Sequence, residues 1–292
     1  MAKRILIQLD CDPQPSTFDA VVATDAGVDV LLRHGGVTPA NCVPLVHGAM
    51  FTRGGADLAS TAIFVGGSDV AAAEAVWHAV RKAFFGPVRV GVMLDPNGAN
   101  TTAAAAVVAA ARHLPLGDQT TAVVLGGTGP VGQRVARLLA RKGVAVGLAS
   151  RSLDRAAAAC ASIRAAVAGA RVDPLEMPLP VRARCPLGAA LAETDLVVAA
   201  GAAGATLLDD EGRRLAVKAR VLVDLNAVPP AGIEGIVATD KAKAEGSVVL
   251  YGALGVGGTK MKIHKAAIGR LFASTDAVLD AEELLGIGES LA

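Results

Sequence analysis

Short apolar runs alternate with segments of helical spacing along this chain of 292 residues. Runs of the buried-strand type occupy residues 5–9, 61–65, 88–94, 122–125, 144–149, 196–200, 220–224 and 248–251. Between them, apolar side chains recur at the period of a helix. These helical segments cover residues 18–30, 38–47, 70–85, 103–112, 131–142, 153–167 and 187–192. Strands that alternate with helices predict an α/β fold with a doubly wound parallel sheet, whose ligands lie beyond the carboxyl ends of the strands.

The alternation is interrupted at residues 113–119, which contain Pro115 and Gly117. Proline and glycine together mark a loop, and the chain is longer than one ordinary hydrophobic core requires. We therefore expect two domains: an N-terminal α/β domain over residues 1–116 and a Rossmann-type domain over residues 117–268. The stretch after the last apolar run is predicted to be mainly helical from Lys260 onward.

The clearest chemical signal lies in residues 121–155. A strand leads into G-x-G-x-x-G, formed by Gly127, Gly129 and Gly132, and a helix and a second strand follow. In this context the first glycine permits a tight turn, the second lets the backbone approach a pyrophosphate, and the third lets the helix pack closely on the strand. The helix N-terminus adds a partial positive charge. We predict a dinucleotide site made by Gly127, Thr128, Gly129, Pro130, Val131 and Gly132.

The end of the second strand indicates which dinucleotide binds. NAD sites carry Asp or Glu about 20 residues after the first glycine, to accept a hydrogen bond from the ribose 2′-hydroxyl. This chain instead has Ser150, Arg151 and Ser152, followed by Arg155. A guanidinium binds a 2′-phosphate through several donors, so NADP is favoured over NAD. Plain solvated surface charges are the alternative interpretation of the two arginines.

Composition excludes several functions. The formal net charge of +1 leaves no electrostatic signature of nucleic-acid binding. The four cysteines are scattered without C-x-x-C spacing, so we expect neither a metal site nor disulfides. The first apolar run is too short for a signal peptide, and the longest is too short to span a bilayer. We expect a cytoplasmic protein.

Familiar proton-transfer groups are missing. The only tyrosine, Tyr251, is not part of Y-x-x-x-K, and the histidines lie far apart in sequence. Oxidation of an alcohol needs a group that takes the hydroxyl proton. Oxidation of a methylene carbon held between two nitrogens does not, because loss of the hydride alone leaves a stabilised amidinium. Such a reaction requires mainly binding, alignment and exclusion of water.

Several further segments have no generic Rossmann explanation, and through them the chain resembles the bacterial NADP-dependent methylene-tetrahydromethanopterin (methylene-tetrahydrofolate) dehydrogenases over almost its whole length. These segments are residues 15–19, 36–39, 51–55, 60–67, 84–87, 94–102, 127–132 and 252–258. The resemblance implies hydride transfer from methylene-tetrahydromethanopterin to NADP in one-carbon metabolism, with tetrahydrofolate as a possible second carrier. It also implies that the N-terminal part, completed by the C-terminal helix 269–292, binds the pterin.

The expected pterin-binding residues lie on N-terminal loops that follow strands. They are Asp19, Asp95, Asn97, Thr101 and Thr102. Helix capping and turn formation are the structural alternatives for this set. Lys260 is expected to follow a glycine-rich loop at a strand end and to position the pterin, or else to be a solvated lysine. Three residues are placed near the nicotinamide by their strand-end positions: Asn226, Ala253 and Leu254.

Two other functions remain open at this stage. A shikimate-type NADP dehydrogenase would share the two-domain plan, but it would need a Lys/Asp pair in the N-terminal domain. A non-enzymatic NADP-binding sensor would keep the glycine motif alone. The apolar helices suggest a homo-oligomer. The missing Y-x-x-x-K predicts a dehydrogenase without cyclohydrolase activity.

Overall fold

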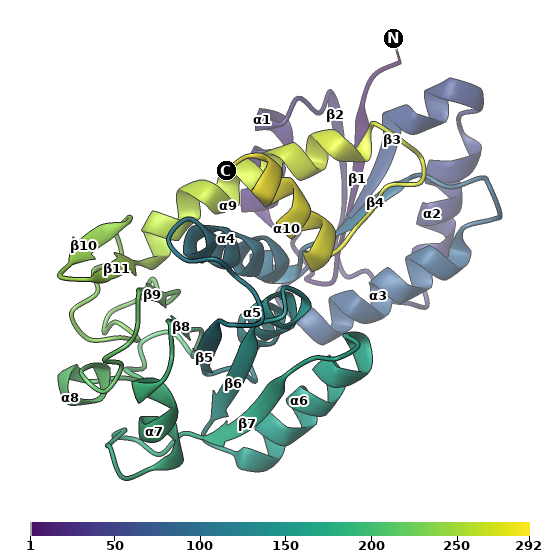
Figure 1. Ribbon diagram of the computed structural model, residues 1–292. Coiled ribbons are helices and arrows are strands. Elements are labelled where there is room, and N and C mark those ends of the chain that lie inside the picture. The colour runs from purple at the N-terminus through teal and green to yellow at the C-terminus, as the bar shows by residue number, and fades with distance from the viewer. Residues whose placement is uncertain (1) are drawn as a thin grey trace. The chain divides into compact units, whose positions relative to one another are not determined.

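The computed structural model describes residues 2–292, which form two compact units (Figure 1). The first unit holds the chain up to Thr101 together with Met261–Leu291, and the second holds Thr102–Lys260 and Ala292. The changes of unit after Thr101 and after Lys260 fall inside helices, α4 (Ala99–Ala111) and α9 (Ala253–Leu271). The sequence had suggested boundaries at 116/117 and 268/269. A boundary within a continuous helix does not interrupt the helical pattern of the sequence.

The first unit is built on five strands. They are β1 (Ile5–Asp10), β2 (Val30–His34), β3 (Thr61–Gly66), β4 (Gly91–Leu94) and β12 (Val278–Leu279). They pair in parallel in the order β12-β4-β3-β1-β2, so the segment near the C-terminus forms one edge of the N-terminal sheet. The helical elements of this unit are α1 (Thr17–Asp25), α2 (Cys42–Phe51), η1 (Gly55–Ser60), α3 (Val70–Ala83), η2 (Pro96–Gly98) and α10 (Ala281–Ser290).

Alternate residues of β1, β3 and β4 face opposite sides of this sheet. On one side Leu9, Val65 and Leu94 pack into a core with apolar side chains of α2 and α3, such as Met50 and Trp77. On the other side the ring of Phe64 in β3 stacks on His264 of α9. The carboxyl ends of β1, β3 and β4 therefore lie side by side between two layers of helices.

The second unit contains seven strands. They are β5 (Thr121–Leu125), β6 (Ala145–Ser150), β7 (Val172–Glu176), β8 (Leu196–Ala199), β9 (Val221–Asp224), β10 (Lys243–Glu245) and β11 (Val248–Tyr251). Their order is β10-β11-β9-β8-β5-β6-β7, and all pair in parallel except β10. The helices are α5 (Pro130–Arg141), α6 (Leu153–Ala166), α7 (Pro186–Ala192) and α8 (Asp210–Arg213). The predicted α/β fold with parallel sheets in two parts is confirmed.

Some elements differ from the sequence-based expectation. The helical segment 18–30 ends early, because Gly27 adopts a left-handed φ of 82° and the chain continues into β2. Residues 252–258 were expected to form a loop, but α9 begins at Ala253. Within residues 2–292, no helix has both the length and the apolar character needed to cross a membrane.

Candidate functional site

The glycine loop of the second unit is shaped by close backbone contacts. The N–H of Gly127 donates to the carbonyl of Ala149 at 2.9 Å, which ties the loop to β6. A Cβ added to Gly132 would lie 2.8 Å from Cα of Gly127, so only glycine allows α5 to start this near the strand. A Cβ on Gly129 would meet nothing nearer than 3.5 Å. An alanine would therefore fit at position 129, the N-cap of α5, in ordinary contact with the carbonyl oxygens of Gly126 and Ala200.

The loop after β6 lies beside the glycine loop, as parallel pairing of β5 with β6 requires. The hydroxyls of Thr128 and buried Ser150 are 3.3 Å apart, and Ser152 caps α6 by accepting the N–H of Arg155. Arg151 and Arg155 are exposed. A cavity of about 340 Å³ is lined by Thr128, Gln133, Arg155, Ala158, Ala159 and Ser162. The predicted cofactor residues at these two loops are therefore brought together.

The loop after β9 is organised by Asp224, whose side chain is buried. Its two carboxylate oxygens accept the N–H groups of Asn226 at 3.0 Å and Ile233 at 3.1 Å. Burial raises the pKa of Asp224. The amide of Asn226 donates to the carbonyl of Pro230 and accepts from the N–H of Val228. These contacts show that the Asn226 side chain shapes its own loop, and its proposed place near the nicotinamide stays a prediction.

The start of α9 corrects the expected environment of three residues. Ala253 and Leu254 form the first turn of a helix and not a strand-end loop, and the N–H of Leu254 donates to the carbonyl of Ala238 at 2.7 Å. Lys260 lies further along the same helix and is half-buried. Gly255 serves close packing, because a Cβ there would lie 1.9 Å from the carbonyl oxygen of Asp240. Close approach to the preceding loop overrides the low helix propensity of glycine.

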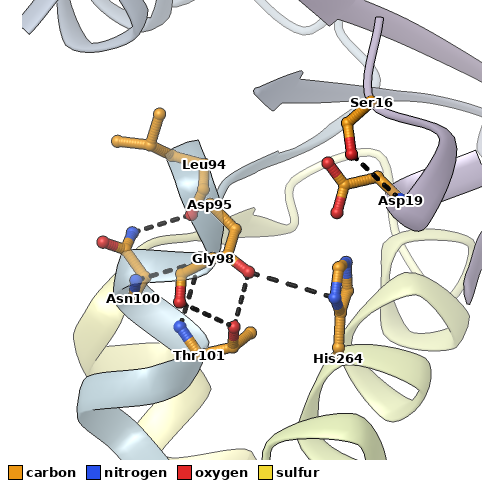
Figure 2. Close-up of polar contacts among 8 residues, drawn as sticks. All are labelled: Ser16, Asp19, Leu94, Asp95, Gly98, Asn100, Thr101 and His264. Carbon is orange, nitrogen blue, oxygen red and sulfur yellow. Dashed lines mark hydrogen bonds and ion pairs between the residues drawn. The ribbon is translucent and has the colours of Figure 1, made fainter. Parts of the chain in front are cut away.

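In the first unit, a polar network forms where β4 ends and α4 begins (Figure 2). Asp95 is fully buried, and one of its oxygens accepts the N–H groups of Asn100 and Thr101 at 2.9 and 3.0 Å. Its other oxygen accepts the Thr101 hydroxyl at 2.6 Å. The amide of Asn100 donates to the carbonyl of Leu94 and to the carboxylate of Asp280, both at 2.7 Å. Asp95 and Thr101 thus hold the N-terminus of α4, which was the structural alternative for them.

The same network reaches α9 through His264, which was not among the predicted site residues. The imidazole Nδ1 lies 4.0 Å from Oδ2 of Asp95, and both side chains are wholly buried. Figure 2 shows Asp19 extending from α1 toward His264, above the end of β4. Asp19 is half-buried at the first turn of α1, where its N–H donates to the Ser16 hydroxyl. The structure therefore brings Asp19, Asp95 and His264 to one edge of the sheet.

The remaining predicted residues lie near this edge with different exposures. Asn97 is exposed and adopts a left-handed φ of 51° in the turn between β4 and α4. Thr102 is half-buried in the first turns of α4. Buried Asp10 at the end of β1 was not predicted, and its carboxylate accepts the N–H groups of Asp12 and Ser16, both at 3.0 Å. Hydrophobic patterning assigned Asp10 to a loop and carried no signal for this contact.

Solved structures with the same architecture are distant in sequence. The quinate dehydrogenase from Corynebacterium glutamicum in complex with NAD matches 99% of this chain and 100% of its own at a TM-score of 0.53 and 18% identity. The 5-ketofructose reductase of Gluconobacter sp. strain CHM43 matches with full coverage of both chains, a TM-score of 0.54 and 14% identity. At these identities the likeness concerns the fold alone.

Sequence relatives are much closer. Residues 17–97 match the family model described as methylene-tetrahydromethanopterin dehydrogenase, N-terminal. The "Bifunctional protein MdtA" of Methylorubrum extorquens is 46% identical, with 100% of both chains covered. The NAD(P)-dependent methylenetetrahydromethanopterin dehydrogenase of the same organism is 34% identical, with 89% of each chain covered. These matches confirm the resemblance drawn from the loop segments: the chain belongs to the methylene-tetrahydromethanopterin dehydrogenase family.

Proposed function

We propose that this protein oxidises methylene-tetrahydromethanopterin to the methenyl form by hydride transfer to NADP, and that methylene-tetrahydrofolate is a second substrate. The observation that carries the proposal is the full-length likeness to dehydrogenases of this family, combined with an intact glycine loop. The alternative of a shikimate-type dehydrogenase has only a likeness of fold in its favour. The remaining alternative, a non-enzymatic NADP-binding sensor, would bind NADP without turnover in an activity assay.

The residues of the second unit fit a dinucleotide. Gly129 lets the backbone at the N-terminus of α5 approach a pyrophosphate, whose charge this helix end favours. The side chains that follow β6 favour NADP over NAD. Arg151 and Arg155 supply charged donors for a 2′-phosphate, whereas a carboxylate at this strand end would repel it. Asp154 lies in the first turn of α6, where a carboxylate is stabilised by the helix dipole.

The first unit supplies most of the groups that recognise the pterin. The carboxylate of Asp19 accepts hydrogen bonds from the amide N–H and amino group of the pterin edge, while Asn97 and Thr102 offer polar groups nearby. Buried Asp95 and Thr101 contribute by holding the start of α4 in place. Lys260 positions a carbonyl group of the pterin and does not act as a base.

When bound, NADP supplies the nicotinamide ring that accepts the hydride. The chain's own residues need only orient the methylene carbon and exclude water, because both ring nitrogens stabilise the cationic product. No proton is removed in this step, which is consistent with a site built from carboxylates, threonines and a lysine. The same reasoning excludes cyclohydrolase activity from the proposal. We further propose a cytoplasmic homo-oligomer whose partner molecules are pterin one-carbon carriers.

A spectrophotometric assay tests the proposal. Purified protein is mixed with methylene-tetrahydromethanopterin or methylene-tetrahydrofolate, each with NADP and with NAD, and formation of the reduced nucleotide is followed. We expect turnover with both carriers and the highest kcat/KM with tetrahydromethanopterin and NADP. Turnover with shikimate and none with either pterin would overturn the substrate. NADP binding without turnover of any of the three would favour the sensor.

A further inference from the structure

His264 is enclosed by residues from three elements of the first unit. Its ring stacks on Phe64 of β3, with centroids 5.7 Å apart and an interplanar angle of 19°. The ring of Phe18 at the start of α1 lies 6.4 Å away, and the carboxylate of Asp95 at the end of β4 lies 4.0 Å from Nδ1. The start of α1, strand β3 and the residue that follows β4 therefore all contact this one imidazole.

Burying a histidine at this position lowers the stability of the folded protein. Its side chain is wholly buried, and burial of a polar ring disfavours the folded state unless the surroundings compensate. An apolar side chain of similar size would fill the space between Phe18 and Phe64 at lower cost. Part of the compensation comes from the carboxylate of Asp95, which also anchors α4. The imidazole thus links the α4 anchor to the aromatic rings at the start of α1.

The exposed part of the carboxyl edge of the sheet lies next to the imidazole of His264. Phe18 is 51% exposed although it borders His264, and Asp19 follows it in the chain. A Cβ added to Gly66 would lie 2.9 Å from Cε1 of Phe64 and 3.7 Å from Oδ2 of Asp19. The absence of a side chain at Gly66 therefore leaves the space in which Phe64 and Asp19 take their present positions.

We propose that His264 is a positioning residue for the pterin. Held by its contacts with Asp95 and Phe64, the imidazole fixes the positions of the Phe18 and Asp19 side chains. In this arrangement the exposed ring of Phe18 stacks on the flat face of the pterin ring. The carboxylate of Asp19 accepts hydrogen bonds from the N–H groups at the edge of the same ring. The inference rests on the proposed function, because the ring that Phe18 and Asp19 receive is the pterin of the substrate.

The test compares steady-state kinetics of His264→Leu and His264→Asn with the wild-type enzyme. Leucine removes the polar contact with Asp95, whereas the asparagine amide keeps a polar group where Nδ1 stands. We expect His264→Leu to raise KM for methylene-tetrahydromethanopterin by roughly tenfold or more, since small misplacements of binding groups have effects of this order. His264→Asn should recover part of that loss. KM for NADP should stay within about twofold in both variants, because its predicted ligands lie in the second unit.

A second variant and a control make the outcome decisive. Gly66→Ala crowds Phe64 without touching His264, and should also raise KM for the pterin selectively. Lys265→Ala removes the 2.7 Å ion pair to Asp25, which joins the same helices α9 and α1 on the surface, and should leave both KM values unchanged. Melting temperatures and NADP binding are measured for each variant to show that it is folded.

The possible failures are distinguishable. A wild-type enzyme without activity on either pterin would refute the proposed function itself. With an active wild type, an unchanged pterin KM in both His264→Leu and Gly66→Ala would overturn the positioning role. Equal losses for NADP and pterin, or no recovery in His264→Asn, would show that His264 only supports the fold. If His264→Leu does not fold, Gly66→Ala and His264→Asn decide the matter by the same criteria.

Discussion

The carboxylate of Asp95 and the imidazole of His264 lie 4.0 Å apart, and both side chains are completely buried. One residue directly follows strand β4, and the other lies in helix α9 near the C-terminus. Between them they join the start of α4, the β3 side chain Phe64 and the helix α9. Because the buried carboxylate of Asp95 has this many partners, its contribution to the stability of the fold can be measured separately from substrate binding.

Asp95→Ala should destabilise the first unit strongly. It leaves the N–H groups of Asn100 and Thr101 and the Thr101 hydroxyl without their acceptor in a buried place. We expect a loss of roughly 3 kcal/mol or more in the free energy of unfolding, measured by urea denaturation. The matched control is Asp69→Ala, which removes an exposed cap of α3 and should cost about 1 kcal/mol. Equal losses in the two variants would show that the buried network adds nothing beyond ordinary capping.

Gly129→Ala should separate cofactor binding from folding. Alanine fits the protein here, because its Cβ would be 3.5 Å from the nearest atom. The methyl group would occupy the space assigned to the pyrophosphate. We expect an unchanged melting temperature and a rise of at least about tenfold in the dissociation constant for NADP, measured by calorimetry.

Gly132→Ala should have the opposite effect to Gly129→Ala, because it disturbs the fold. Its Cβ would lie 2.8 Å from Cα of Gly127, so α5 must move and the melting temperature should fall. Normal NADP affinity in Gly129→Ala would contradict the assignment of the pyrophosphate to this loop.

Local patterns predicted the cofactor loop well. The strand β5, the glycines, α5 and β6 follow one another directly in the chain, so each position depends on neighbours in sequence. Edge strand β2 was not predicted: the helical spacing over residues 18–30 continues through the turn at the left-handed Gly27 to Val30, the first residue of the strand. Short-range periodicity does not distinguish a long helix from a helix followed by an edge strand.

The pterin side depends on contacts that sequence spacing does not contain. Asp95 was identified, but its engagement with α4 and His264 follows from the folded sheet and not from a motif. Glycines 255, 257 and 258 suggested a loop, whereas Gly255 serves close packing of α9 against Asp240. A glycine indicates that a side chain is excluded, and only the structure shows whether a turn or a neighbouring backbone excludes it.

Arg151→Ala should weaken NADP use selectively. A charge-assisted hydrogen bond to the 2′-phosphate contributes on the order of 1.5–3 kcal/mol, so KM for NADP should rise about tenfold or more. KM for NAD should change little, since NAD lacks that phosphate. Arg214→Ala is the control, because this exposed arginine pairs with Asp210 on α8. Equal losses with NADP and NAD would refute the assignment of Arg151 to the 2′-phosphate.

Cys11 should be an unreactive thiol at neutral pH. Burial and the carboxylates of Asp10, Asp12 and Asp69 raise its pKa from 9.0 to about 11. The folded protein therefore holds this proton more tightly than the unfolded chain. Its contribution to stability is present below about pH 9 and is lost as the pH rises through about 11.

Alkylation with iodoacetamide, followed by mass spectrometry of the Cys11 peptide, measures that pKa. The rate should still be rising above pH 9.0, the value for an ordinary thiol. Asp12→Asn removes one like charge and should shift the curve to lower pH. A rate that levels off below pH 9.0 would show that the carboxylates do not control the thiol.

The enzyme should form the methenyl carrier without hydrolysing it. Hydrolysis requires an activated water and proton transfer, for which a tyrosine–lysine pair would be one source. The only tyrosine, Tyr251, is buried, and its hydroxyl lies 2.8 Å from Nε2 of His113. Burial and the neighbouring Arg112 lower the pKa of His113. Product analysis over time decides the question: formation of the formyl carrier in proportion to enzyme concentration, above the uncatalysed rate, would show a second, hydrolytic activity. Lys260→Ala is measured alongside; if Lys260 only positions the pterin, activity should fall while the pH profile of the hydride step stays unchanged.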